Sequence, residues 1–380
     1  MLLNIRLVRI NLVSGLAQIV QIGTITPLLA FRLSEAGADS WVIGLVVSAS
    51  WIAVLVASHS LPKILSKIGV VKAIGIGLVL TVVSLALMEI SASHIALFLA
   101  NFIAGIGLIL RWVACDTWIV QAADERERGR AIGVHETLMG LGIALGPMVL
   151  GVTGFDGQSP FLACIGIMLL SLLVLFMARA DDFLANIHSK SSLLPTLKLI
   201  PVAIVGAFSA GFVETSVLSF LSVHLIDISY APRLAAMVLA AYGLGGTLFQ
   251  LPMGWVADTI GFRGAQTLSI VVSIIGSLGV AAFSGFWSLT IAIAFIWGGA
   301  VGAMNTLAVI EAGHTATESQ MSSSMAGIAF AYTLGSVVGP IVSGTVNGYV
   351  GTNGMLFATA ALCIAISVGF MFRKDAFIRT

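Results

Sequence analysis

Residues 141–151 read LGIALGPMVLG and residues 334–344 read LGSVVGPIVSG, so one pattern of glycine, proline and aliphatic residues recurs at an offset of 193 residues. A second pair of segments, 62–69 and 254–261, ends in Ser-Lys-Ile-Gly and Asp-Thr-Ile-Gly and agrees at an offset of 192. Because two unrelated matches give nearly the same period, we expect the chain to consist of two equivalent halves.

The composition around these segments indicates a membrane protein. Of the 380 residues, 58% are hydrophobic and only 9% are charged, whereas a soluble domain has about 25% charged residues. The mean hydropathy is +1.08. A membrane-spanning helix needs about 20 apolar residues. Dividing the sequence where Pro, Gly, Asn and charged residues cluster gives twelve such stretches: 10–33, 40–60, 70–90, 94–118, 130–153, 158–178, 197–222, 231–257, 264–283, 286–311, 320–347 and 352–372.

The repeat and the twelve stretches together predict an all-α polytopic membrane protein made of two six-helix bundles. We expect the N-terminal bundle at residues 1–178, a cytoplasmic linker at 179–196 and the C-terminal bundle at 197–380. In membrane proteins built from parallel repeats of this kind, a substrate binds in a central cavity between the bundles, near the bilayer midplane.

The basic residues predict the orientation, because lysine and arginine gather in cytoplasmic loops. Fifteen of the 18 fall on the side of the two termini, only Arg32 and Arg233 fall opposite, and Arg111 lies within the fourth stretch. Both termini should therefore be cytoplasmic, in the inner or plasma membrane. A signal peptide cleaved near residues 36–38 is the alternative for the first stretch. Polar residues in that stretch argue against it: Gln18, Gln21 and Thr24.

Several classes of function have no support in the sequence. The net charge of +1 gives no basic surface for nucleic acid. No Walker loop, zinc-ligand spacing or nucleophile elbow is present, so we expect neither an enzyme nor a bound cofactor or metal. Cys115, Cys164 and Cys363 all fall in apolar stretches, where a thiol usually behaves as a small buried hydrophobe, and no disulfide is expected.

Residues 254–263, GWVADTIGFR, lie in the short loop between the eighth and ninth stretches. They resemble the loop signature G-x-x-x-D-R-x-G-[RK]-[RK] of the major facilitator superfamily, and the resemblance extends over nearly the whole chain. Thr259 replaces the usual basic residue, and the equivalent first-half loop has Pro62 for the glycine and Ser66 for the aspartate. Residues 142–151 are similar to the fifth-span Gly-Pro motif of the drug–proton antiporters, although the motif also recurs in the eleventh stretch.

The fourth stretch narrows this resemblance. The family's fourth-span motif begins with an arginine, and this chain has Asn101 there. Trp112 with Asp116, followed by Arg128-Gly129-Arg130, is more similar to the YcaD-like permeases, a bacterial branch. The resemblance implies that the first, fourth, seventh and tenth spans line the cavity.

One face of the first stretch is polar. Asn11, Ser14, Gln18 and Gln21 follow helical spacing and form a stripe that should face water or protein. Asn305 is the candidate of the tenth stretch. Serines in the seventh stretch are weaker candidates, since serine often bonds to its own helix: Ser209, Ser216 and Ser219.

Charged side chains at bilayer depth cost roughly 2.5–3.5 kcal/mol each, so each needs a partner, water or a function. At ~1.5 Å per residue, Arg111 and Glu136 lie at similar depths, about 9–10 Å from the cytoplasmic edge. We therefore expect them to form a buried ion pair, which could be purely structural. If Arg111 is not paired, it is the best candidate to bind an anionic group of a substrate.

The remaining ionisable residues have two readings each. Asp116 and Glu311 could simply lie at the cytoplasmic interface, or one of them, or Glu136, could carry a proton, because an apolar site favours the neutral carboxyl. Glu214, in the outer half of the seventh stretch, could contact a cationic group or lie half-exposed at a bend. His135 could join a proton relay, but a packed, hydrogen-bonded histidine is the reading we favour.

The loop signature and the Gly-Pro motifs are expected to control gating. By the family's pseudosymmetry, Asp258, between Gly254 and Gly261, should approach the start of the fifth span, where the helix end and Arg130 favour a carboxylate. In the other half, Ser66 offers only neutral hydrogen bonds. The Gly-Pro pairs favour close helix packing, and kinks there could also help each bundle bend: Gly146-Pro147 and Gly339-Pro340.

These observations predict a secondary transporter that moves a small organic solute by alternating access, driven by protons. The Gly-Pro motif favours export, and a proton-coupled importer or a uniporter is the alternative. A membrane sensor or assembly partner without transport is the alternative of another class. We expect a monomer whose partners are the lipid bilayer, a small-molecule substrate and protons.

Overall fold

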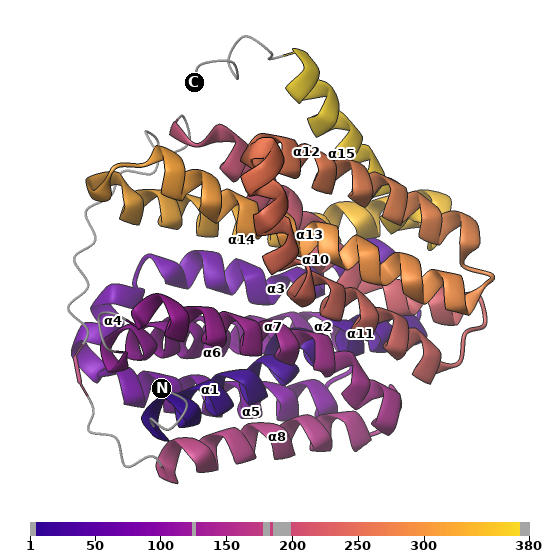
Figure 1. The fold of residues 1–380 in the computed structure, drawn as a ribbon. Coiled ribbons are helices and arrows are strands. Elements are labelled where there is room, and N and C mark those ends of the chain that lie inside the picture. Colours follow the sequence, from indigo (N-terminus) through magenta and orange to yellow (C-terminus); the bar gives the residue numbers. More distant parts are fainter. Residues whose placement is uncertain (1–4, 124–126, 178–182, 185–198, 373–380) are drawn as a thin grey trace. The chain divides into compact units, whose positions relative to one another are not determined.

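The computed structural model describes residues 5–123, 127–177, 183–184 and 199–372, and every element in these ranges is a helix (Figure 1). The elements of the first half are α1 (Ile5–Gln18), η1 (Ile19–Thr24), α2 (Ile25–Glu35), α3 (Ser40–Ser58), α4 (Leu61–Ile68), α5 (Val70–Ile90), α6 (His94–Ala122), α7 (Arg128–Thr153) and α8 (Ser159–Met177). Those of the second half are α10 (Pro201–Asp227), α11 (Pro232–Leu248), α12 (Gln250–Phe283), α13 (Trp287–Thr315), α14 (Glu318–Val350) and α15 (Gly354–Phe372).

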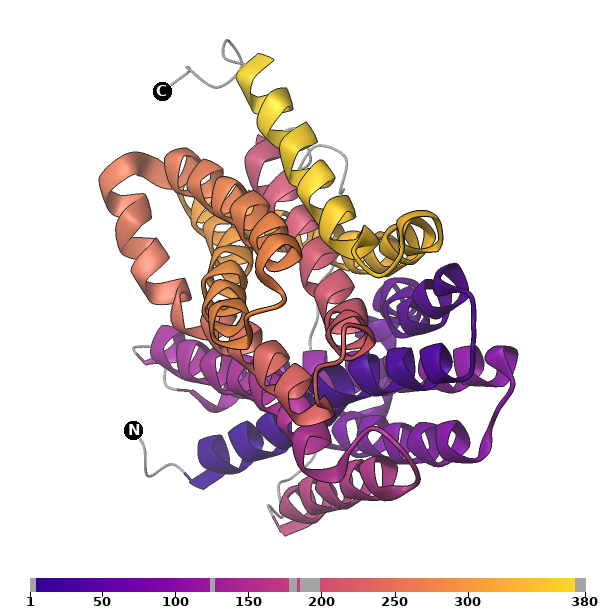
Figure 2. The ribbon, with the colours of Figure 1, turned by 90° about the vertical axis from the view of Figure 1, so that its right-hand side faces the viewer.

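The chain divides into two compact units. Unit 1 takes its residues from Met1–Ala38, Leu45–Lys190 and Ala231–Ala240, and unit 2 from Asp39–Gly44, Ser191–Tyr230 and Ala241–Thr380. In unit 1, α5 and α6 lie side by side, and in unit 2, α12 pairs with α13 in the same way (Figure 2). The predicted linker lies almost wholly outside the described residues.

Ten helices of the described chain are long and apolar enough to cross a membrane, and α15 contains a shorter apolar helix. The bounds of these helices follow the predicted stretches closely. The exception is the predicted span at 231–257, which the structure divides between α11 and α12 at Phe249. Pro252, which has no N–H to donate, stands in the first turn of α12, where an N–H needs no partner in the helix. The helix α12 then continues through a kink at Gly261 into the predicted ninth span.

The first predicted span is one continuous run of three elements. Its middle turn, η1, is a π-helix, a form that is rare and usually short. The Thr24 hydroxyl donates to the Ile19 carbonyl at 2.7 Å and to the Gly146 carbonyl at 2.9 Å. A Cβ added at Gly23 would lie 2.8 Å from the Gly146 Cα, so the two backbones touch here. The widened turn therefore lies where α7 packs most closely against the first span.

The internal repeat is confirmed by glycine contacts. Gly142 packs against the carbonyl of Gly15, and Gly335 packs against the carbonyl of Phe208. Gly335 follows Gly142 by 193 residues, and Phe208 follows Gly15 by the same number. One turn further on, Gly146 meets the Ile19 carbonyl and Gly339 meets that of Phe212, again 193 residues apart. A side chain at any of these glycines would clash with the facing backbone. Close packing of small residues, one of the two readings of the Gly-Pro motifs, is thus confirmed.

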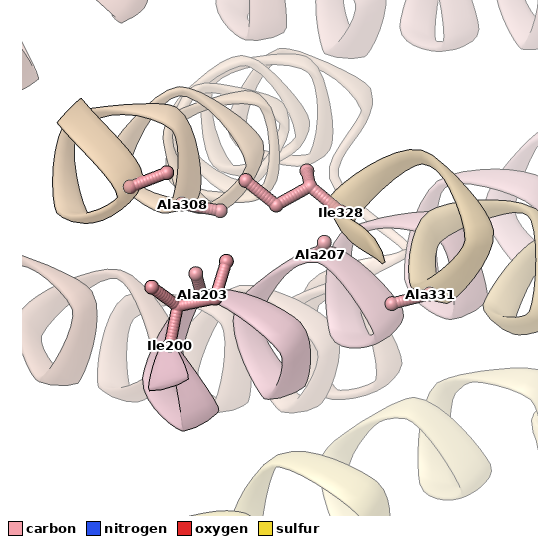
Figure 3. Close-up of a cluster of buried hydrophobic side chains, with 7 residues drawn as sticks. Ile200, Ala203, Ala207, Ala308, Ile328 and Ala331 are labelled. Atoms are coloured by element: carbon pink, nitrogen blue, oxygen red, sulfur yellow. The ribbon is translucent and has the colours of Figure 1, made fainter. Parts of the chain in front are cut away.

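Unit 2 is held together partly by small side chains. The helices α10, α13 and α14 meet in a cluster that is nearly all alanine and isoleucine (Figure 3). Alanine lets neighbouring helices approach closely in a membrane protein. The labelled members are Ile200, Ala203, Ala207, Ala308, Ile328 and Ala331.

Candidate functional site

The polar stripe of the first span faces protein, and its principal partner is Arg111 of α6. This guanidinium is completely buried. Its Nε donates to Gln21 Oε1 at 3.0 Å, its Nη1 donates to Ser14 Oγ at 2.9 Å and lies 3.7 Å from Met139 Sδ, and its Nη2 donates to Gln18 Oε1. Three consecutive members of the stripe thus surround one cation.

A glycine contact between α5 and α6 extends this network. Gly77 and Gly107 face each other so closely that a Cβ on either would lie 2.6 Å from the carbonyl oxygen of the other. The approach brings Thr81 of α5 beside Gln21, whose Nε2 donates to Thr81 Oγ1 at 2.7 Å. Gln21 is therefore fixed on both sides, as acceptor from Arg111 and as donor to Thr81. Thr81 is a functional neighbour that the sequence pattern did not single out.

The expected ion pair of Arg111 with Glu136 is not present. Within the described part of the chain, Arg111 makes no ion pair with any carboxylate, and Glu136 is exposed. The physical reason is the direction of the side chains, since consecutive helical residues point ~100° apart. His135 and Met139 occupy the buried face of α7, and Glu136 therefore points away from it.

A second polar cluster lies on the same helices. His135 is buried, and its Nδ1 lies 2.7 Å from Oδ1 of Asn11, the first member of the stripe. Its Nε2 lies 3.3 Å from Oδ1 of Asp116, whose side chain is 40% exposed. His135 is thus buried and hydrogen-bonded, and its role in a proton relay stays a prediction.

Unit 2 holds Glu214 in a different environment. Tyr332 donates from Oη to Glu214 Oε2 at 2.9 Å. Tyr242 is buried nearby, edge-on to Trp297 with ring centroids 5.5 Å apart. Neither tyrosine was predicted, although Tyr332 follows Met139 by 193 residues and so occupies the equivalent place in the repeat. The serines of α10 bond to carbonyls of their own helix, as expected: Ser209, Ser216 and Ser219.

The tenth-span candidates are both in α13. Glu311 is only 2% exposed, so it does not lie at a solvated surface, and its Oε2 has no hydrogen-bond partner among the described residues. Asn305 is partly buried, and its Oδ1 likewise has none in this part of the chain. Both residues lie on α13, and within the described residues no hydrogen bond or ion pair joins Asn305 to another predicted site residue.

The gating candidates lie mostly at the surface. Asp258 and Arg130 are exposed, and a Cβ at Gly254 would meet nothing within 4 Å. Gly261 has φ 78° and ψ 155°, and Gly69, its equivalent in the first half, has φ 89° and ψ 158°. Only glycine adopts such values readily. The second glycine of the loop signature is therefore required by the backbone in both halves.

Comparison with known proteins agrees with this architecture. The sequence pattern of the Major Facilitator Superfamily matches residues 12–224 and again residues 203–378. The chain is 25% identical to the uncharacterised MFS-type transporter YfkF of Bacillus subtilis (strain 168) over 341 residues, which cover 87% of this chain and 85% of YfkF. It is 22% identical to the uncharacterised YcaD of Escherichia coli (strain K12 / DH10B) over 332 residues, 87% of this chain and 86% of YcaD.

Solved structures show the same fold. The nucleoside transporter NupG superposes with a TM-score of 0.80 at 16% identity, over 100% of both chains. A bacterial homologue of the human lysosomal transporter Spinster, in an inward-facing and unoccupied conformation, gives 0.73 at 15% identity, with 97% of each chain covered. The resemblance to the YcaD-like permeases is confirmed. This chain belongs to the Major Facilitator Superfamily, and it is an all-helical, multi-pass membrane transporter.

Proposed function

We propose that this protein is a proton-coupled secondary transporter that moves a small organic solute with an acidic group across the inner or plasma membrane. In this proposal it works as a monomer by alternating access, with twelve spans in two six-helix bundles, a central cavity and both termini in the cytoplasm. Its direction is export, which the resemblance of the Gly-Pro motif favours.

The observation that carries the proposal is the environment of Arg111. A buried cation in a membrane-spanning helix is costly unless it has a counter-charge or a function. In the described structure its partners are the neutral groups of Ser14, Gln18, Gln21 and Met139. A shell of neutral acceptors satisfies the N–H groups and leaves a full positive charge, so the site still favours an anion.

The forked geometry of arginine suits a carboxylate or a phosphate, because two parallel N–H groups can bind two oxygens. Binding would exchange the amide oxygens of Gln18 and Gln21 for oxygens of the solute. Gln18 directly precedes η1 and Gln21 lies within it, so this exchange would change contacts of the first span itself. Recognition of the solute and movement of a cavity-lining helix are linked in this way.

The test compares the small molecules inside cells and in the medium for four strains. These carry the wild-type protein, Arg111→Gln, Arg233→Gln as an exposed control, and an empty vector, at matched protein levels. We expect at least one acidic solute to shift with the wild type and with Arg233→Gln, and not with Arg111→Gln. The sign of the shift gives the direction.

Four coincident profiles in several media would count against transport and favour the sensor or assembly role. A shift that persists in Arg111→Gln would leave transport standing and exclude Arg111 as the anion site. A shift that does not respond to dissipation of the proton gradient would identify a uniporter.

A further inference from the structure

We propose that His135 and Asp116 together bind a single proton, which is the coupling proton of the transport cycle. The inference rests on the proposed function and assigns its proton to a place. Its basis is the geometry of three side chains from three helices: Asn11 of α1, Asp116 of α6 and His135 of α7.

Asn11 determines which ring nitrogen of His135 carries hydrogen. An amide oxygen can only accept a hydrogen bond, so the 2.7 Å contact with Asn11 Oδ1 requires His135 Nδ1 to be the donor. In a neutral imidazole the other nitrogen, Nε2, then presents a lone pair. That nitrogen lies 3.3 Å from Asp116 Oδ1.

The two facing atoms have no other partner. His135 Nε2 and Asp116 Oδ1 are both buried, and neither finds a hydrogen-bond partner elsewhere in the described chain. They lie 3.3 Å apart. Without a proton, two buried acceptor atoms lie near each other, an arrangement that costs roughly 1–3 kcal/mol for each unsatisfied group. One bound proton replaces this repulsion with an attraction, as an ion pair of charged His135 with the Asp116 carboxylate.

The charges around the pair allow the proton to bind and to dissociate. The ionisable groups that interact electrostatically with Asp116 are Arg111, Cys115 and Glu136, and the helices α1 and α7 carry further basic residues, among them Arg9 and Arg130. The positive charge of Arg111 opposes an added proton, whereas the negative charge of Glu136 favours it. Because the Asp116 side chain is 40% exposed, the pair has a route to solvent while His135 stays buried.

Loss of the proton would affect α1, the helix whose polar stripe binds the guanidinium of Arg111. Asn11 belongs to the stripe whose next three members, Ser14, Gln18 and Gln21, bind the guanidinium. Repulsion between His135 and Asp116 would displace the ring that Asn11 holds and so release one end of α1. Proton binding and anion binding would thus be coupled through one helix.

The direct test is spectroscopic and needs no substrate. Full-length protein with 15N-labelled histidine is titrated by NMR, with the His135 signals identified by their loss in His135→Gln. Infrared spectra of the same samples report protonated carboxyl groups. We expect the spectra recorded at neutral pH to show one proton held by the pair. The sign is either doubly protonated His135 or a carboxylic acid band that disappears in Asp116→Asn.

Glu136→Gln is the matched control, because it removes a neighbouring exposed carboxylate, and it should leave the signal in place. Neutral His135 together with ionised Asp116 at that pH would overturn the proposal. So would a proton signal that survives in Asp116→Asn.

A transport measurement separates this inference from the proposed function. In vesicles, His135→Gln should still move the solute down its own gradient but should lose accumulation driven by a pH gradient. If His135→Gln accumulates the solute as well as the wild type does, the transporter proposal stands and the proton assignment is wrong. If the wild type moves no solute while the spectroscopic proton is present, the proposed function and the coupling role are wrong, and only the proton site at His135 and Asp116 stands.

Discussion

Gln21 and Glu214 occupy equivalent places in the two repeats, 193 residues apart, and each accepts a hydrogen bond from another helix of its own unit. Gln21 accepts from Arg111, whereas Glu214 accepts from Tyr332. The first half therefore places a neutral acceptor beside a buried cation, and the second places an acidic acceptor beside a phenol. The two halves thus share the position of the acceptor and differ in its chemistry.

The hydrogen bond between Tyr332 and Glu214 should stabilise the protein by more than the burial of the two side chains alone. Tyr332→Phe removes the donor to a largely buried carboxyl, so we expect it to lower the free energy of unfolding by roughly 1–3 kcal/mol. The same change in a Glu214→Leu background should cost clearly less, because no carboxyl remains to be satisfied. Thermal unfolding of the four proteins in detergent measures the difference. Equal costs in the two backgrounds would show that the contact contributes nothing specific.

The guanidinium group of Arg111 should not be replaceable by the ammonium group of lysine. Arg111→Lys keeps the charge, but a single ammonium cannot reach Ser14, Gln18 and Gln21 together. We expect a loss of roughly 1–3 kcal/mol in unfolding free energy for each acceptor left without a donor, together with loss of solute transport. Arg233→Lys, at an exposed site, should match the wild type in both measurements. Wild-type stability of Arg111→Lys would contradict the hydrogen-bond network.

The glycines of α7 should differ sharply in their tolerance of a methyl group. A Cβ at Gly146 would lie 2.4 Å from the Gly23 backbone, whereas one at Gly133 would meet nothing within 4 Å. We therefore expect Gly146→Ala to destabilise the protein by about 1–3 kcal/mol and Gly133→Ala to be neutral or slightly stabilising. Thermal unfolding and the yield of folded protein provide the comparison. Similar behaviour of the two variants would mean that α7 does not pack on the first span as described.

The loop signature should matter more in the second half than in the first. Ser66 donates to the Lys63 carbonyl of its own helix at 3.1 Å, so Ser66→Ala removes only a local contact. Asp258→Asn removes an exposed charge that the latch predicted from the sequence requires. We expect it to slow transport roughly fivefold, the equivalent of about 1 kcal/mol for a carboxylate near a helix start. Initial rates of solute flux test this, and equal rates in both variants would exclude the charged latch.

The sequence was sufficient to predict the helices and much of their packing. Hydropathy and helix-breaking residues located the spans, and the repeat predicted glycine contacts that the structure shows in both halves. The polar stripe of the first span was also recognised from its spacing. Hydropathy could not locate the division at Phe249, because the residues on either side of it remain apolar.

The partners of the buried charges were harder to predict. The depth of each residue along its helix axis put Arg111 and Glu136 at the same level. It gave no information on the rotation of α7 about its own axis, which decides which side chains face α6. That rotation is set by packing, and it places His135 and Met139 inward. The Asp116–His135 contact depends on the same rotation and could not be read from spacing alone.

The neutral shell around Arg111 also has a consequence for how the protein is made. The arginine is synthesised 97, 93 and 90 residues after its acceptors Ser14, Gln18 and Gln21. The first span has therefore left the ribosome before the fourth must partition into the bilayer, and a charged helix can meet its acceptors as soon as it enters. Biogenesis of the first half thus does not need to wait for any residue of the second half to shelter this charge.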